Sequence, residues 1–201
     1  MRAFARVGVE RRCHLKRVIL TIGPQCAGKS TLCEKCLLVN PEIILVSRDK
    51  ILMELFGSVW LDPYTGGHFY GMKVMWERVK KHLEQEDVTL ILDTWNGYLH
   101  ERKAIIEKLR SMNVERIDAW YFITPKNTCL EWFLQRESSS PKEGRKFPDA
   151  MSKMRKDSCI RDYEFYHSHQ IGDELFDSVK RINSLQPPSF DELLALQGQS
   201  R

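Results

Sequence analysis

Five short apolar runs, rich in β-branched residues, alternate along the chain with longer amphipathic segments. The apolar runs cover residues 17–22, 42–46, 88–92, 117–122 and, with a weaker pattern, 177–182. Helical periodicity occurs between them, at 29–38, 50–56, 70–86, 100–112, 126–137 and 148–166. Strands separated by helices run parallel in one sheet, and the helices then cover both of its faces. The pattern therefore predicts a doubly wound α/β domain with a mostly parallel five-stranded sheet, in which ligands bind at the carboxyl ends of the strands.

The chain has 201 residues, 42% of them hydrophobic, which is enough for one substantial core. No window approaches the roughly 18 consecutive apolar residues of a membrane span, and the N-terminus lacks the apolar middle of a secretory signal. These features predict a soluble, cytoplasmic protein. An Arg-rich, acid-poor start is also compatible with targeting to an organelle.

The expected α/β domain covers 17–183 and carries an extension at each end. A basic segment, 1–16, precedes it, and a tail, 184–201, follows it. In the tail, Ser189 lies three residues before Glu192, which is the spacing of a capping box and predicts a short peripheral helix. A polar break at about 137–147, rich in Ser, Pro and Gly, predicts a mobile loop between two helices.

The net charge is +4, and the basic residues gather in two stretches, 2–17 and 136–161. Such local positive charge suits a polyanionic partner, although Lys and Arg also cluster on ordinary solvated surfaces. The six cysteines are spread through a chain of medium size, whereas disulfide frameworks normally staple shorter secreted chains. We therefore expect free thiols in a reducing compartment.

The stretch VILTIGPQCAGKSTL, 18–32, places the pattern GxxxxGK[ST] between a predicted strand and a predicted helix. Its glycines allow backbone N–H groups to curl around a phosphate, and the helix that follows points its positive end at the same anion. Lys29 would pair with the β- and γ-phosphates, and the Ser30 hydroxyl would bind Mg²⁺. The stretch thus predicts a site for a nucleoside triphosphate, such as ATP, with Mg²⁺. The predicted nucleotide-binding residues are Gly23, Gln25, Cys26, Ala27, Gly28, Lys29, Ser30 and Thr31.

Two acids follow neighbouring predicted strands. Arg48 and Asp49 come just after the second strand, and Asp93 and Thr94 come just after the third. In a parallel sheet both strand ends open onto the edge that carries the phosphate loop. A carboxylate there can accept a proton from an attacking hydroxyl or hold Mg²⁺. Asp49 could instead be the N-cap of the next helix, and Asp93 a simple turn residue.

Cations gather in or beside the polar break, where they could close over a bound triphosphate and neutralise charge on the moving phosphoryl group. They are Arg136, Lys142, Arg145 and Lys146. The alternative is an ordinary charged surface loop.

With these residues in place, the chain resembles the kinase domain of the bacteriophage-type polynucleotide 5′-hydroxyl kinases, from about residue 17 to residue 166. VILTIGPQCAGKSTL is similar to that family's phosphate loop, and NPEIILVSRDK to its acceptor-activating segment. LILDTWN, followed by Arg102, looks like its third motif. FLQRE and FPDAMSKM look like the helices that flank its lid.

The resemblance implies a fold of the P-loop kinase type with a helical lid, and transfer of the γ-phosphate of ATP to the 5′-hydroxyl of RNA or DNA. It implies that Asp49 is the general base and that Lys29 and Ser30 hold ATP and Mg²⁺. Arg136 matches one lid arginine, and Lys142 or Arg145 would be the second. The implied acceptor-binding residues are Arg48, Asp49, Asp93, Thr94 and Arg102, and Ser30 is an implied metal ligand. Asp93 is a second predicted metal ligand, because an acid at the end of this strand matches the metal-binding acid of phosphate-loop proteins in general.

One position departs from that family. Three residues after the general base, where the family has an arginine that grips the acceptor phosphate, this chain has Leu52. A small hydroxyl compound such as a nucleoside or a sugar is therefore a second candidate acceptor, and a nucleotide-dependent switch is a third possible function. Several aromatic side chains near the expected acceptor side could stack on bases or fill the core. They are Trp60, Tyr64, Phe69, Tyr70, Trp95 and Tyr98.

Overall fold

Five parallel strands form one sheet in the order β2-β3-β1-β4-β5. The strands are β1 (Lys16–Ile22), β2 (Ile44–Ser47), β3 (Val88–Asp93), β4 (Arg116–Phe122) and β5 (Ser178–Ile182). The structure is a computed structural model, and it describes residues 15–59, 66–139, 149–169, 171 and 176–195. The predicted five-stranded α/β sheet is confirmed, and every strand pair in it is parallel.

Seven helices are present in the described part of the chain. They are α1 (Lys29–Val39), α2 (Arg48–Phe56), α3 (Gly66–His82), α4 (Leu99–Ser111), α5 (Lys126–Ser139), α6 (Asp149–Ser168) and α7 (Phe190–Leu194). Six of them match the predicted segments or the predicted tail helix to within two residues at each end. The exception is α3, which begins and ends four residues earlier than its periodicity predicted. Its first residues are two glycines, which periodicity counts as neutral.

Helices cover both faces of the sheet, because alternate residues of the central strands point to opposite sides. Val18, Leu20 and Ile22 of β1 pack in a cluster with side chains of α3 and α4. Ile19 of the same strand packs on the other face, in a cluster that includes side chains of α1, α5 and α7. A sheet buried on both sides explains why the central strands read as nearly continuous apolar runs.

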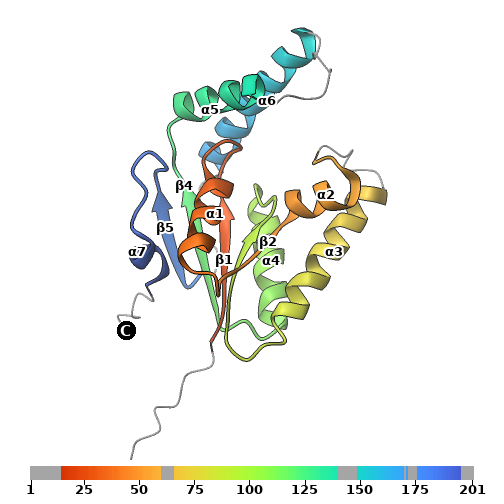
Figure 1. Cartoon of the computed structure of the whole chain (residues 1–201), viewed down its shortest axis with the longest axis vertical. Coiled ribbons are helices and arrows are strands. Elements are labelled where there is room, and N and C mark those ends of the chain that lie inside the picture. The colour runs from red at the N-terminus through yellow and green to blue at the C-terminus, as the bar shows by residue number, and fades with distance from the viewer. Residues whose placement is uncertain (1–14, 60–65, 140–148, 170, 172–175, 196–201) are drawn as a thin grey trace, which may run out of the picture.

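All five strands point the same way, so their carboxyl ends meet at one edge (Figure 1). Helices α5 and α6 rise above this edge, and α2 and α3 stand to one side of it. The core of the predicted lid, 140–148, lies outside the described residues, as do Trp60 and Tyr64. The carboxyl edge, where folds of this class bind ligands, thus has α5 and α6 above it and α2 and α3 beside it.

A buried ion pair holds β1 to β4 near their amino-terminal ends. The Arg17 guanidinium contacts the Asp118 carboxylate at 2.6 Å, and both side chains are almost fully buried. Burial raises the pKa of Asp118, but hydrogen bonds from Arg116, Ser178 and Arg17 outweigh it and lower the pKa below its ordinary value. Arg17 also donates to the carbonyl of Leu194 at 2.6 Å, which attaches the end of α7 to the sheet.

The predicted capping box is present at the start of α7, where Ser189 accepts a hydrogen bond from the backbone N–H of Glu192.

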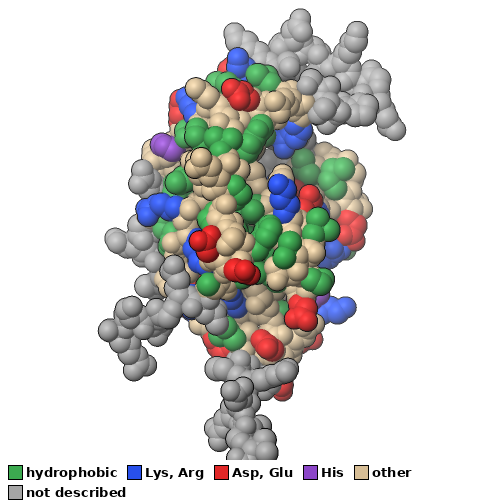
Figure 2. Space-filling view, turned by 60° about the vertical axis from the view of Figure 1, so that its left-hand side comes forward, with side chains coloured by type: hydrophobic (Ala, Val, Ile, Leu, Met, Phe, Trp, Pro, Cys, Tyr) green, Lys and Arg blue, Asp and Glu red, His purple; other side chains and the backbone are tan. Residues whose placement is uncertain are grey.

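On the face shown in Figure 2, basic and acidic side chains are interspersed. No disulfide joins any of the five cysteines in the described part of the chain. Among the helices that the structure describes, none has the length and apolar composition that crossing a membrane requires.

Candidate active site

The loop between β1 and α1 has the backbone conformation of an anion cradle. Gly23, Cys26 and Gly28 have φ angles of 145°, 58° and 91°. At Gly28 an added Cβ would lie 2.5 Å from the Ser184 Oγ, so both the backbone angle and the available space require glycine. Successive N–H groups in such a loop, followed by a helix N-terminus, form a site suited to a phosphate.

Lys29, in the first turn of α1, folds back over this loop. Its Nζ donates to the carbonyls of Gly23 and Pro24, each at 2.7 Å. Ser30 and Thr31 follow it and are exposed. An ammonium group, backbone N–H donors and a serine hydroxyl within one loop are the donor set that a triphosphate with Mg²⁺ requires, so the residues present fit that ligand.

Asp93 ends β3 at the same edge, and hydroxyl groups from two neighbouring strands fix its carboxylate. Thr21 of β1 donates to Oδ1 at 2.7 Å, and Ser47 of β2 donates to Oδ2 at 3.3 Å. Ser47 and Asp93 are register partners, which confirms that the two predicted acidic strand ends are neighbours. The buried Cys33 lies close to the Asp93 carboxylate. Burial and the Asp93 charge raise the pKa of the Cys33 thiol, and the Lys29 charge offsets part of that rise.

Asp49 lies in the first turn of α2, whose N-cap is Ser47. The alternative that Asp49 is the N-cap is therefore wrong. Arg48 contacts the Asp49 carboxylate at 2.9 Å, and the side chains are 20% and 59% exposed. Lys50 forms an ion pair with Glu34 at 3.0 Å, which connects α2 to α1. The Asp49 carboxylate is thus accessible and oriented by its neighbour.

Two buried side chains, Asn96 and Arg102, hold the loop after β3 through hydrogen bonds to backbone carbonyls. Asn96 is fully buried and donates to the carbonyl of Thr21 at 2.7 Å. Arg102 is 1% exposed and donates to the carbonyls of Gly97 at 2.7 Å and Asn96 at 3.3 Å. This differs from the expected contact between Arg102 and an acceptor, because its guanidinium lies beneath the loop. Thr94 is also buried, and its Oγ1 has no hydrogen-bond partner among the described residues.

Leu52, which stands where the resembling family has an arginine, is 1% exposed. It packs against Gly71 of α3 so closely that a Cβ added to Gly71 would lie 2.4 Å from the Leu52 Cδ2. The side chain therefore belongs to the interface between α2 and α3. A cation at this position would start from a buried site between the two helices.

Asp162 of α6 reaches the phosphate loop and was not predicted from the sequence. Its Oδ2 accepts a hydrogen bond from the Gln25 N–H at 2.6 Å. Burial raises the pKa of Asp162, and the Gln25 N–H and the Lys29 charge lower it in part. Three residues earlier on α6, the Cys159 thiol contacts the Cys26 thiol of the loop. No local pattern marks Asp162, because it is one of many charged residues in a long helix.

The lid cations are described only in part. Arg136 is exposed in the last turn of α5, directly before the segment 140–148. Lys142, Arg145 and Lys146 lie outside the described residues. The site that the structure describes therefore comprises the phosphate loop, Asp93 and the end of β2, with Asp162 on the α6 side.

Comparison with known families gives one match that covers most of the domain. The sequence profile of the AAA domain matches residues 18–156, which is more than half of the chain. It begins inside β1 and runs into α6, so it includes the phosphate loop, both acidic strand ends and the lid segment. No curated protein matches the sequence significantly.

Solved structures share the fold at low sequence identity. A chain of the Pnkp1/Rnl/Hen1 RNA repair complex has a TM-score of 0.58 at 16% identity, over 81% of this chain and 48% of that chain. The present chain thus spans about half the length of that relative. A protein from Chloroflexus aurantiacus, provisionally described as a kinase, has a TM-score of 0.60 at 13% identity, over 90% of this chain and 95% of that chain. A fungal RNA kinase has a TM-score of 0.50 at 14% identity, over 84% and 75%.

Proposed function

The chain belongs to the AAA domain family, and from that premise we propose that it is an ATP- and Mg²⁺-dependent phosphotransferase with a hydroxyl acceptor. The acceptor that we propose is the 5′-hydroxyl end of RNA or DNA. One observation carries this proposal: the phosphate loop with Lys29 and the anchored carboxylate of Asp93 lie at one edge of the sheet, and the accessible Asp49 follows the adjoining strand. A nucleotide-dependent switch needs no second acid at this edge.

ATP with Mg²⁺, when bound, would supply the γ-phosphoryl group. The N–H groups of the phosphate loop and Lys29 would bind the phosphate oxygens, and Ser30 and Asp93 would hold the metal ion. Thr21 and Ser47 orient the Asp93 carboxylate, yet a carboxylate has about four lone-pair sites and so retains capacity for a further partner.

Asp49 would act on the acceptor. Its carboxylate would accept the proton of the attacking hydroxyl, and Arg48 would keep it oriented. Arg48 would contact the acceptor, and the buried Thr94 and Arg102 would instead help to position the loop after β3. Arg136 of α5, together with Arg145, would neutralise the charge that develops on the transferred group.

Two of the structural relatives support a nucleic-acid acceptor, because one belongs to an RNA repair complex and another is an RNA kinase. The burial of Leu52 favours the second candidate, a small hydroxyl compound, because the position that would grip an acceptor phosphate holds no cation. In the proposed function Arg48, with 20% of its side chain exposed, contacts the acceptor phosphate instead.

The test is transfer of labelled γ-phosphate from ATP to 5′-hydroxyl oligonucleotides of RNA and DNA, with Mg²⁺, by the wild type and by Asp49→Asn. We expect labelling by the wild type and a loss of roughly 100- to 10,000-fold in Asp49→Asn, the usual contribution of a general base. Glu54→Gln is the matched control, since Glu54 is another exposed acid on α2, with 57% of its side chain exposed against 59% for Asp49.

The outcome separates the two acceptors. Labelled oligonucleotide supports the proposal. If the wild type labels no oligonucleotide but phosphorylates a nucleoside or sugar with the same dependence on Asp49, then the acceptor is a small molecule. Binding of ATP without transfer to any hydroxyl compound would refute the phosphotransferase.

A further inference from the structure

Two large aromatic side chains stand exposed beside the proposed acceptor site. Trp95 and Tyr98 lie in the loop that directly follows Asp93, and they are 42% and 43% exposed. Side chains of this size usually bury most of their surface. The sequence left two alternatives for them, stacking on bases or filling the core, and their exposure disfavours the second.

Both side chains contact a cluster of rings from α4 and from the end of α6. Trp95 stacks with Phe165 at an interplanar angle of 24°, with centroids 6.2 Å apart, and Phe165 stacks with His169 at 4.2 Å. Tyr98 stacks with His100 at 5.2 Å and meets Phe165 edge-on at 4.6 Å. The exposed pair is thus supported by other rings, which fix the orientation of both side chains.

Hydrogen bonds to one carboxylate also hold this loop. The Trp95 indole N–H donates to Glu101 at 3.2 Å, and the backbone N–H of Tyr98 donates to the same carboxylate at 3.0 Å. Gly97 leaves room for the rings: a Cβ there would lie 2.6 Å from the Phe165 Cε1 and 2.9 Å from the Trp95 Cζ2. A loop held this firmly presents its two aromatic side chains in a fixed arrangement, which lowers the entropic cost of binding a flat ligand.

We propose that Trp95 and Tyr98 form a stacking platform for a nucleobase at the 5′-hydroxyl end of a single-stranded nucleic acid. This inference rests on the proposed function and names the part of the acceptor that the site recognises. A nucleobase is the flat, apolar-faced group that lies next to the reacting hydroxyl, and Trp95 is only two residues from Asp93. Stacking on aromatic side chains binds every base and selects single strands, whose bases are free.

The platform also offers a physical replacement for the arginine that is missing at position 52. The loss of one phosphate contact removes affinity for the acceptor backbone, and stacking of a base restores affinity without a charge. Base stacking on an aromatic side chain contributes roughly 5- to 150-fold in affinity per base. That is enough to orient an end whose phosphate is held by fewer cations.

The experiment measures binding of a short single-stranded 5′-hydroxyl oligonucleotide, labelled at its 3′ end, by fluorescence anisotropy. A second oligonucleotide has an abasic 5′-terminal nucleotide and keeps the hydroxyl and all phosphates. We expect the wild type to bind the abasic strand roughly 5- to 150-fold more weakly. Because this comparison uses the wild-type protein, it does not depend on the folding of a variant.

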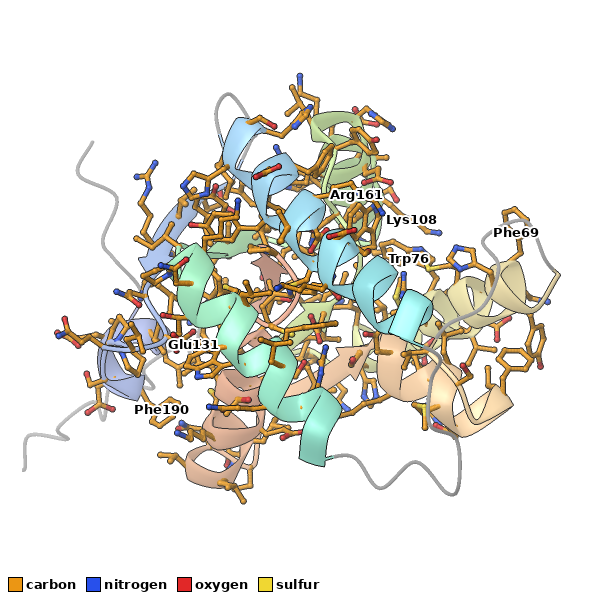
Figure 3. All side chains as sticks on the ribbon, turned by 90° about the horizontal axis from the view of Figure 1, so that it is seen from above. Phe69, Trp76, Lys108, Glu131, Arg161 and Phe190 are labelled. Atoms are coloured by element: carbon orange, nitrogen blue, oxygen red, sulfur yellow. The ribbon has the colours of Figure 1, made fainter. Side chains whose placement is uncertain are left out.

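Variants assign the effect to the platform. Trp95→Ala and Tyr98→Ala should bind the normal strand more weakly and discriminate less against the abasic one, whereas Trp95→Phe should retain most of the discrimination. Phe69, another candidate for base stacking, is 64% exposed at the outer end of α3, away from α6 (Figure 3), so Phe69→Ala should keep the discrimination. Leu38→Ala is the matched control, because Leu38 is 84% exposed near the end of α1, at the other end of that helix from the phosphate loop. It should bind both strands as the wild type does.

Equal binding of the two strands by the wild type overturns the platform, and so does the absence of any binding. Discrimination that survives in both alanine variants also overturns it. Phosphoryl transfer to the same strands is measured separately. Transfer without discrimination leaves the phosphotransferase and removes the platform, and discrimination without transfer leaves the platform and removes the proposed reaction.

Discussion

The Oδ2 of Asp162 on α6 accepts a 2.6 Å hydrogen bond from the backbone N–H of Gln25 in the phosphate loop. The two residues are 137 positions apart, and α6 is the helix that follows the lid segment. The contact therefore connects the backbone of the proposed nucleotide site to the element that carries the lid. It also places a carboxylate close to Lys29, whose charge acts on the Asp162 pKa.

Asp162→Asn should change how stability depends on pH. Burial raises the pKa of Asp162 above its ordinary value of 3.8, so the folded state holds its proton to higher pH than the unfolded chain does. The free energy of unfolding of the wild type therefore falls as pH rises from that value toward the raised one, and the variant lacks this contribution. The amide oxygen can still accept the Gln25 N–H.

Urea unfolding of both proteins across the acidic and neutral range checks this. The stability of Asp162→Asn relative to the wild type should grow as pH rises through the window and then level off. Asp157→Asn, an exposed acid on the same helix, is the control. A constant difference at all pH values would contradict the expected linkage.

Lys29→Met should strongly reduce nucleotide-dependent transfer while the fold remains. The Lys29 ammonium contacts two carbonyls of its own loop, so its removal should cost only about 1–2 kcal/mol of stability. Loss of a charged donor to the transferred group should lower the transfer rate on the order of 100-fold or more. The labelled-ATP assay and thermal unfolding measure the two effects. Lys35→Met, an exposed position on α1, should leave both unchanged.

Leu52→Arg should destabilise the protein and should not create an acceptor clamp. The side chain at this position packs against Gly71 between α2 and α3, and burying an unpaired cation there costs several kcal/mol. Met53→Arg, one residue along and 50% exposed, should be tolerated. Chemical unfolding of the two variants gives the comparison. Wild-type stability in Leu52→Arg would mean that the α2–α3 interface opens easily.

Asp118→Ala should lower the free energy of unfolding by about 3–5 kcal/mol, because it leaves Arg17 buried without its partner. Hydrogen bonds to Asp118 hold its pKa below 3.8, so the wild type loses this stabilisation as pH falls through the lowered value, and the variant does not. Unfolding by urea at neutral and acidic pH tests both statements. The difference between the proteins should shrink in acid. A difference that is the same at both pH values would contradict the expected loss of this stabilisation in acid.

Gly97→Ala should displace the rings of the stacking platform. The added methyl group collides with Phe165 and Trp95, and overpacking of this kind costs about 1–3 kcal/mol. Discrimination against the abasic strand should fall with it. Gly66→Ala is the control, since a Cβ there meets no described atom within 4 Å. Unchanged stability and unchanged discrimination in Gly97→Ala would show that the rings adjust freely.

Much of the fold could be predicted from the sequence because its information is local. Short continuous apolar runs and helices of period 3.6 are visible in the residues themselves, and the phosphate loop is recognised from glycine and lysine at fixed spacing. The boundaries of α3 could not be predicted, because glycine disfavours helix and the two glycines that begin α3 therefore carry no helical signal. The role of Arg102 could not be predicted either, because a guanidinium that binds backbone carbonyls and one that would face an acceptor look the same in a sequence.

By itself, the sequence determined that strands and helices alternate, that a phosphate loop joins the first pair, and that acids follow two strands. Only the tertiary structure decided the strand order, the anchoring of Asp93 by Thr21 and Ser47, and the burial of Leu52. It alone brought Asp162 to Gln25 and set Phe165 behind Trp95. The physical reason is that these contacts join residues far apart in the chain, and their geometry follows from how helices pack on the sheet, which no local pattern encodes.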